Sequence, residues 1–194
     1  MMIGLNSGSA VTAKRIRSGS VGVEIGVWKG DTSARFLRKA GHLHLVDPWS
    51  IAPYDGPGEF ASGKEYLHRY SELVGSEDPA QFRAFYDQVH ADVVKRFAGE
   101  PVTIHRMTSA KFFETFTEQV DWVYIDGLHS FTGCMTDLRG AHRIVKPGGA
   151  IYGDDYGMRN HHRLGGVTRA VDQFAAANKL HVRKLGGLQF EIRV

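Results

Sequence analysis

Residues 121–130, DWVYIDGLHS, place a carboxylate, a glycine and an imidazole at the end of an apolar run. The run from Trp122 to Ile125 is typical of a buried strand, and Asp126 and His129 follow it at once. A carboxylate can hold a proton or a cation, and an imidazole with an unperturbed pKa near ~6.5 suits a general base near neutral pH. Either the strand ends in an ordinary turn, or it delivers these groups to a site.

Polar side chains also follow four other predicted strands. In an open parallel sheet, ligands bind beyond the carboxyl ends of the strands, and those ends meet at one edge. We therefore expect these side chains to share a site, since solvation alone does not explain their common position. The residues are Glu24 with Gly26, Asp47, Thr108 with Ser109, and Asp154 with Asp155.

The glycines after the first strand limit the kind of ligand. Gly26 and Gly30 fit a plain turn, and they would also let a ligand approach the backbone closely. Their spacing is neither the Gly-x-Gly-x-x-Gly of a nicotinamide site nor a phosphate loop, and bulky Trp28 stands where a pyrophosphate would need room. Asp47 follows Glu24 by 23 residues, a suitable distance for an acid that accepts hydrogen bonds from ribose hydroxyls. A ligand with a ribose but no phosphate therefore fits best.

Short apolar strands alternate with helical patterns along most of the chain. This order indicates a mostly parallel sheet with helices on both faces. Asp31 can cap the first helix and Gly41 can end it in a left-handed conformation. We predict an α/β fold, a Rossmann-like doubly wound sheet of seven strands that ends in an antiparallel hairpin at Gly186-Gly187. The predicted strands are 21–27, 43–47, 102–106, 121–126, 150–155 and the hairpin within 181–194, and the predicted helices are 31–41, 81–97, 109–116, 131–145 and 165–179.

Size and composition favour a single domain over residues 1–194, because 42% of the residues are hydrophobic. We expect residues 1–20 to form a loose arm, which could reach a neighbouring subunit of a homo-oligomer, and residues 48–80 to form a lid or substrate insertion. The single cysteine, Cys134, rules out an internal disulfide and a cysteine-based zinc cluster. It is expected to be buried.

Charge and hydropathy argue against two classes of partner. The formal net charge is +3, but basic and acidic residues are interleaved, so we expect no nucleic-acid partner. No apolar segment approaches the ~18–20 residues that span a bilayer, and the first residues lack a secretory pattern. We therefore expect no membrane partner and a cytoplasmic protein.

The motifs VEIGVWKGDTS, HLVDPW and DWVYIDGLHSFTGCMTDLRGAHRIVKPGGAIYGDDY together resemble those of a known family. The resemblance is to S-adenosylmethionine-dependent methyltransferases of the class I fold, and it covers roughly residues 20–156. Within them, the chain is similar to the group that includes macrolide-sugar and other small-molecule O-methyltransferases. It implies methyl transfer to a hydroxyl of a small molecule, such as a sugar.

The resemblance also implies where the cofactor, S-adenosylmethionine, would lie. The family often carries an acid after the third strand for the adenine amine, whereas this chain has Met107-Thr108-Ser109, so hydroxyl or backbone groups would have to serve. The residues implied in cofactor binding are Glu24, Gly26 and Gly30 near the methionine moiety, Asp47 at the ribose, Thr108 and Ser109 near the adenine, Trp49 against the adenine or the substrate, and Asp126.

A divalent cation, Mg²⁺ or another, is implied at Asp126, Asp154 and Asp155. Three carboxylates at adjacent strand ends would repel one another without a cation, and Mg²⁺ prefers oxygen ligands. A bound cation lowers the pKa of a coordinated hydroxyl, so the acceptor oxygen could attack the methyl carbon in line with the departing sulfur. His129, with Asp126, would act as the catalytic base.

Several alternatives stay open at this stage. The enzyme could be a metal-independent N- or O-methyltransferase in which His129 acts with Asp126. The chain could also bind S-adenosylmethionine without catalysis. His161 and His162 fit either substrate contacts or a polar loop, and Tyr124 is expected in the core.

Overall fold

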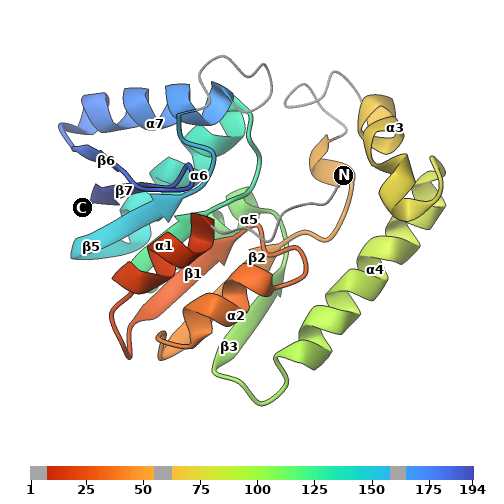
Figure 1. Ribbon diagram of the computed structural model, residues 1–194, viewed down its shortest axis with the longest axis horizontal. Coiled ribbons are helices and arrows are strands. Elements are labelled where there is room, and N and C mark those ends of the chain that lie inside the picture. Colours follow the sequence, from red (N-terminus) through yellow and green to blue (C-terminus); the bar gives the residue numbers. More distant parts are fainter. Residues whose placement is uncertain (1–7, 55–62, 158–164) are drawn as a thin grey trace.

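The computed structural model describes residues 8–54, 63–157 and 165–194, and its strands form one sheet. The strands are β1 (Val21–Ile25), β2 (His42–Asp47), β3 (Val102–Arg106), β4 (Val120–Ile125), β5 (Val145–Gly153), β6 (Val182–Lys184) and β7 (Phe190–Arg193). Their order across the seven-stranded sheet is β3-β2-β1-β4-β5-β7-β6 (Figure 1). Neighbours are parallel from β3 to β5, and β7 is antiparallel to both β5 and β6. The predicted fold class is confirmed.

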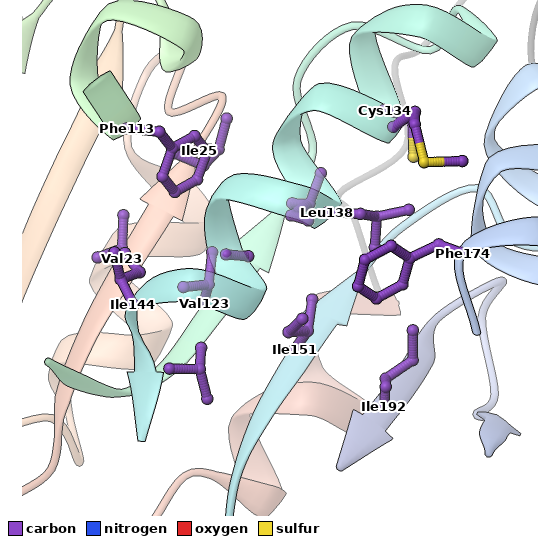
Figure 2. Close-up of a cluster of buried hydrophobic side chains, with 14 of the residues drawn as sticks. Val23, Ile25, Phe113, Val123, Cys134, Leu138, Ile144, Ile151, Phe174 and Ile192 are labelled. Atoms are coloured by element: carbon purple, nitrogen blue, oxygen red, sulfur yellow. The ribbon is translucent and has the colours of Figure 1, made fainter. Parts of the chain in front are cut away.

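Helices cover both faces of this sheet. They are α1 (Gly8–Arg15), α2 (Asp31–Leu37), α3 (Gly63–Val74), α4 (Pro79–Arg96), α5 (Ser109–Thr115), α6 (Phe131–Ile144) and α7 (Gly165–Asn178), with a short 3₁₀ turn η1 (Ala52–Tyr54). One apolar cluster joins the sheet to α5, α6 and α7, and the other joins it to α2 and α4. Figure 2 shows the first, where Val123 and Ile151 of the sheet face Leu138 and Phe174 of the helices.

The central strands are buried on both faces, which explains their nearly continuous apolar runs. β1 and β4 are direct neighbours although β2 and β3 lie between them in the sequence. The chain therefore first builds the sheet outward on one side of β1 and then resumes on the other side. Such a switch point leaves a crevice at the carboxyl ends of the two strands, where open α/β sheets bind ligands.

The expected loose arm over residues 1–20 is wrong for the part that the structure describes. Residues 8–15 form α1, in which Ser9 and Thr12 are fully buried, and Ile16 behind it is buried too. Polar side chains make up much of the buried face of this helix, so its sequence shows no broad apolar stripe and only a weak hydrophobic periodicity. Residues 1–7 lie outside the described residues.

Two details of α2 also differ from expectation. Its N-cap is Gly30, in a left-handed conformation with a φ of 78°, and no side chain caps the helix. Asp31 is instead the first helical residue, and its carboxylate pairs with Arg96 of α4 at 2.7 Å. The helix ends at Leu37, and Gly41 is not left-handed; a Cβ there would lie 2.7 Å from the carbonyl oxygen of Gly19, so glycine permits a close backbone contact.

Much of the expected lid over 48–80 is helical. It contains η1, α3 and the start of α4, whose N-cap Asp78 accepts a hydrogen bond from the Ala80 amide at 2.8 Å. Residues 55–62 lie outside the described residues, so a lid function stays a prediction. β5 begins earlier than the predicted strand over 150–155, and it includes Gly148, which has a φ of 80°. Among the helices that the structure describes, none is long and apolar enough to cross a membrane.

Candidate active site at the carboxyl edge of the sheet

The strand ends are tied together by backbone hydrogen bonds. The Asp126 amide donates to the Ile25 carbonyl at 2.8 Å, and the Asp154 amide donates to the Ile125 carbonyl at 3.1 Å. The residues that follow β1, β4 and β5 are therefore held side by side. This is the convergence that the order of the elements predicted.

Gly26 makes the closest contact at this edge. Its φ is 86°, and a Cβ on it would lie 1.9 Å from the carbonyl oxygen of Asp126. A Cβ on Gly30, whose φ is 78°, would lie 2.6 Å from the ring of Phe97. Both glycines are thus required by the packing of the protein itself. Their contact with a cofactor stays a prediction.

Asp47 binds the turn that follows β1. Its carboxylate accepts hydrogen bonds from the amides of Val27 and Trp28, both at 3.0 Å, and of Trp49 at 2.7 Å. Burial raises the pKa of Asp47, while these amides and His90 act to lower it. Asp47 therefore shapes the turn between β1 and α2, and the expected bond to a ribose would use its remaining acceptor capacity.

Two tryptophans take left-handed conformations beside Asp47. Trp28 has a φ of 54° and Trp49 a φ of 41°, and the Trp49 indole donates to the Trp28 carbonyl at 2.9 Å. Only 1% of Trp49 is exposed, and its ring lies 4.8 Å from that of His90. Trp49 is therefore a packed residue here, and its expected contact with adenine or substrate stays a prediction.

Glu24 is fully buried beside the same edge. Among the described residues, neither of its carboxylate oxygens has a partner in hydrogen-bonding geometry. Burial raises the pKa of Glu24 well above its usual range; nearby Asp126 and Asp47 raise it further, and the Ser33 hydroxyl opposes the rise. Glu24, Asp47 and Asp126 therefore lie near one another, as a shared site requires.

Asp126, His129 and Asp155 form a cluster of possible metal ligands. Nε2 of His129 lies 3.1 Å from Oδ2 of Asp155 and 3.7 Å from Oδ1 of Asp126. One ligating atom from each residue lies within 4.8 Å of the others, and all three side chains are partly exposed. Two carboxylates and an imidazole can bind a divalent cation, or they can hold the imidazole ready to accept a proton.

The cluster differs from the expected trio of Asp126, Asp154 and Asp155 in one member. Oδ1 of Asp154 accepts a hydrogen bond from the Asp155 amide at 2.8 Å, and Asp155 has a left-handed φ of 60°. This turn of the backbone brings Asp155 to His129. Within the part of the chain that the structure describes, the cluster contains His129 and not Asp154, and a metal role for Asp154 stays a prediction.

The loop after β3 has a structural use for both of its hydroxyls. Thr108 is the N-cap of α5 and accepts from the Lys111 amide at 3.3 Å. Burial raises the pKa of Asp137 on α6 to about 7, and the Ser109 hydroxyl acts to lower that pKa. Their contact with adenine stays a prediction.

Sequence reasoning missed three polar residues near this edge. Asp137 is 1% exposed on the apolar side of α6, beside Cys134 and Leu138, and a charge at a position of apolar periodicity was the available signal. Tyr124, expected in the core, is buried but has an unpartnered hydroxyl among the described residues. Gln189, fully buried in the closing hairpin, gave no signal. His161 and His162 lie outside the described residues.

Comparisons with known proteins agree with this fold. A family model described as a methyltransferase domain matches residues 23–156. No curated protein matches the chain.

Solved structures with a similar fold include three methyltransferases. They are the SAH-bound methyltransferase PaMTH1 from Podospora anserina (14% identity, 97% of this chain and 76% of that chain covered, TM-score 0.61), the N-methyltransferase NodS from Bradyrhizobium japonicum WM9 (12%, 96% and 91%, 0.58) and the O-methyltransferase NovP (18%, 97% and 77%, 0.57). At these identities the likeness is one of fold.

The doubly wound sheet with its acidic carboxyl edge defines a class I methyltransferase fold. The chain belongs to the methyltransferase-domain family, since the family model covers more than half of it. It is an S-adenosylmethionine-dependent methyltransferase.

Proposed function

We propose that the protein transfers a methyl group from S-adenosylmethionine to a hydroxyl oxygen of a small molecule, with a divalent cation at Asp126, His129 and Asp155. The observation that supports this proposal most directly is the convergence of these three side chains within 4.8 Å of one another at the carboxyl edge of the sheet. They stand beside Glu24 and Asp47, the residues expected at the cofactor.

The chemistry of the donor set fits a divalent cation. Two carboxylates supply oxygen ligands, and the imidazole adds a nitrogen ligand that Mn²⁺ and other transition metals accept more readily than Mg²⁺ does. A divalent cation bound there would lower the pKa of an acceptor hydroxyl nearby. The partial exposure of all three side chains leaves room for an acceptor.

A hydroxyl acceptor explains the imidazole better than an amine does. A hydroxyl must lose its proton as the oxygen attacks the methyl carbon, whereas a neutral amine attacks through a free electron pair. In the metal-independent alternative, His129, held by Asp155 and Asp126, would accept that proton. With a cation bound to Nε2 of His129, the lowered pKa of the hydroxyl would instead let its proton leave to solvent. The fold alone does not decide, because structures of both an O- and an N-methyltransferase resemble it.

Binding the two reactants in line supplies much of the remaining acceleration, which can amount to ~7–11 kcal/mol. Asp47 would bind the ribose while it holds the turn after β1. Glu24 would receive the ammonium group of the methionine moiety. The cluster of Asp126, His129 and Asp155 would hold the acceptor opposite the sulfonium.

The test is a cation dependence measured on a panel of acceptors. The purified enzyme is stripped with a chelator and assayed with S-adenosylmethionine and hydroxylated sugars and phenols, with mass spectrometry detecting the gain of one methyl group. Activity should be lost on stripping and return with Mg²⁺ or Mn²⁺. Full activity in excess chelator would refute the cation and favour His129 acting alone with its carboxylates. Cofactor binding without turnover on any acceptor would favour a non-catalytic protein.

A further inference from the structure

Several buried polar atoms on the face of the sheet that α2 covers make no hydrogen bond of standard geometry. Among the described residues, they include both carboxylate oxygens of Glu24, the hydroxyls of Ser33 and Tyr124, and the side-chain amide nitrogen of Gln189. The Glu191 oxygens on the same face also lack a hydrogen bond, but they form ion pairs with Arg15 and Arg193. Native proteins leave few such atoms, because burying a polar atom without a hydrogen bond destabilises the folded state. Four neighbouring residues with this property require an explanation.

The sheet register places two of these residues side by side. Glu24 of β1 and Tyr124 of β4 are direct partners in the parallel pairing. Both face α2. The ring of Tyr124 lies 4.8 Å from the ring of Phe36, and the hydroxyl of Ser33 is close enough to Glu24 to lower the pKa of its carboxyl group. The Tyr124 hydroxyl and the Glu24 carboxyl group therefore lie on the same face of the sheet, under α2.

Gln189 extends this group toward α1. Its side-chain carbonyl oxygen accepts a hydrogen bond from the Thr12 hydroxyl at 3.0 Å, which fixes the orientation of the amide. Its amide nitrogen is thereby turned away from Thr12. The Gln189 side chain is also close enough to the Tyr124 hydroxyl to act to lower the pKa of that group. A chain of polar groups runs from α1 through Gln189 and Tyr124 to Glu24.

The free groups are chemically complementary. Ser33, Tyr124 and Gln189 can all donate hydrogen bonds, and Glu24 alone is a pure acceptor when it is ionised. A buried Glu24 without a cation favours its neutral form, and a cation beside it favours the carboxylate. A carboxylate would accept from Ser33 and Tyr124, and the Gln189 amide would donate to the Tyr124 oxygen, so the three donors would gain partners together.

We propose that Tyr124 and Gln189 are positioning residues that orient Glu24 to receive the ammonium group of the cofactor's α-amino-acid end. This inference rests on the place of Glu24 in the proposed cofactor site. The two residues act through Glu24 and make the protein select ligands that carry an amino-acid end. A nucleoside without that end gains nothing from them.

Calorimetry with two cofactor analogues tests the proposal. S-adenosylhomocysteine carries the amino-acid end, and 5′-methylthioadenosine lacks it. Tyr124→Phe should weaken S-adenosylhomocysteine binding by about tenfold, the loss expected for a hydrogen bond to a charged group, and leave 5′-methylthioadenosine binding unchanged. Gln189→Met should act in the same direction with a smaller effect.

The matched control is Tyr152→Phe. Tyr152 is the register partner of Tyr124 on β5, it is also buried, and its hydroxyl faces Glu191 instead. This variant should change the affinity for neither ligand. The melting temperature of unliganded Tyr124→Phe should equal or exceed that of the wild type, because the variant removes a buried hydroxyl without a partner.

Two results would overturn the proposal. Equal weakening of both ligands by Tyr124→Phe would indicate a general packing defect, and unchanged S-adenosylhomocysteine binding in both variants would mean that the group serves only the folded core. A wild-type protein that binds neither ligand would instead remove the proposed cofactor site itself, so the two failures are distinguishable.

Discussion

His129 Nε2 lies 3.1 Å from Asp155 Oδ2, although the two residues follow different strands of the sheet. The contact depends on the left-handed turn at Asp155, which aims one of two consecutive carboxylates at the imidazole. The carboxylate of the neighbouring Asp154 instead accepts a hydrogen bond from the Asp155 amide. This division of roles between two adjacent acids can be tested directly.

Asp155→Asn should reduce methyl transfer by about 10²-fold or more, because the variant removes a charge that holds both the imidazole and a cation. Asp154→Asn is the matched variant, since an asparagine oxygen can still accept from the Asp155 amide, and it should retain most of the activity. Steady-state rates of both variants at saturating cofactor provide the measurement. A larger loss in Asp154→Asn would restore the trio of Asp126, Asp154 and Asp155.

The imidazole in the cluster predicts a preference among cations. Stripped enzyme should recover at least as much activity with Mn²⁺ as with Mg²⁺, because a nitrogen ligand suits transition metals better. His129→Asp, which makes the ligand set all oxygen, should shift the preference toward Mg²⁺. The ratio of activities at saturating concentrations of each cation is the readout, and an unchanged ratio would mean that His129 is not a ligand.

Gly26→Ala should disrupt the edge of the sheet, because the new Cβ would lie 1.9 Å from the Asp126 carbonyl oxygen. We expect the free energy of unfolding to fall by more than ~3 kcal/mol. Gly99→Ala is the control, since Gly99 also has a positive φ but no atom lies within 4 Å of its Cβ position. It should cost only about 1–2 kcal/mol. Similar losses in urea unfolding would show that the contact with Asp126 is unimportant.

His44 predicts a loss of stability in mild acid. Burial, with His42 and His105 nearby, lowers the pKa of His44 to about 4, and its Nδ1 lies 3.1 Å from Nε2 of His105. The folded state thus resists protonation while the unfolded chain accepts a proton near pH ~6.5. Stability falls as pH drops from about 6.5 toward 4, by on the order of 2–3 kcal/mol. Urea unfolding of His44→Leu should show a flatter pH dependence, whereas the exposed His68→Gln should not.

Asp137 predicts the opposite slope. Burial raises its pKa to about 7, so the folded state holds a proton that the unfolded chain releases near pH ~4. Stability falls as pH rises from about 4 to 7. Asp137→Asn should remove this slope and stabilise the protein at pH 8 by about 1–3 kcal/mol, since the amide needs no ionisation and can still accept from Ser109. A destabilised variant at pH 8 would show that the charged form has a partner.

The sequence predicted the strand ends well because topology alone determines where they meet. Once β1, β2 and β4 are parallel neighbours, Glu24, Asp47 and Asp126 must share an edge, whatever the side-chain details. The remaining features depend on single torsions or on contacts between distant segments. The left-handed φ of Asp155 brings its carboxylate to His129, so the cluster contains His129 and not Asp154. No pattern in the sequence predicts that angle.

Distant contacts account for the other omissions. Gln189 approaches Tyr124 because β7 returns beside β5, and α1 is buried through Ser9 and Thr12 with no apolar stripe. Periodicity detects apolar faces and therefore misses a helix that packs through hydroxyls. Polar burial of this kind becomes visible only when the partner element is in place.

The three amides that bind Asp47 bear on how ribose recognition can be studied. A carboxylate that secures the turn after β1 cannot be altered without also loosening that turn, so an Asp47 substitution would combine two defects in one measured constant. Changing the nucleoside separates them: a deoxyribose analogue removes the hydroxyls and leaves the protein's architecture intact. In this enzyme, ligand chemistry is therefore the cleaner probe of that interaction.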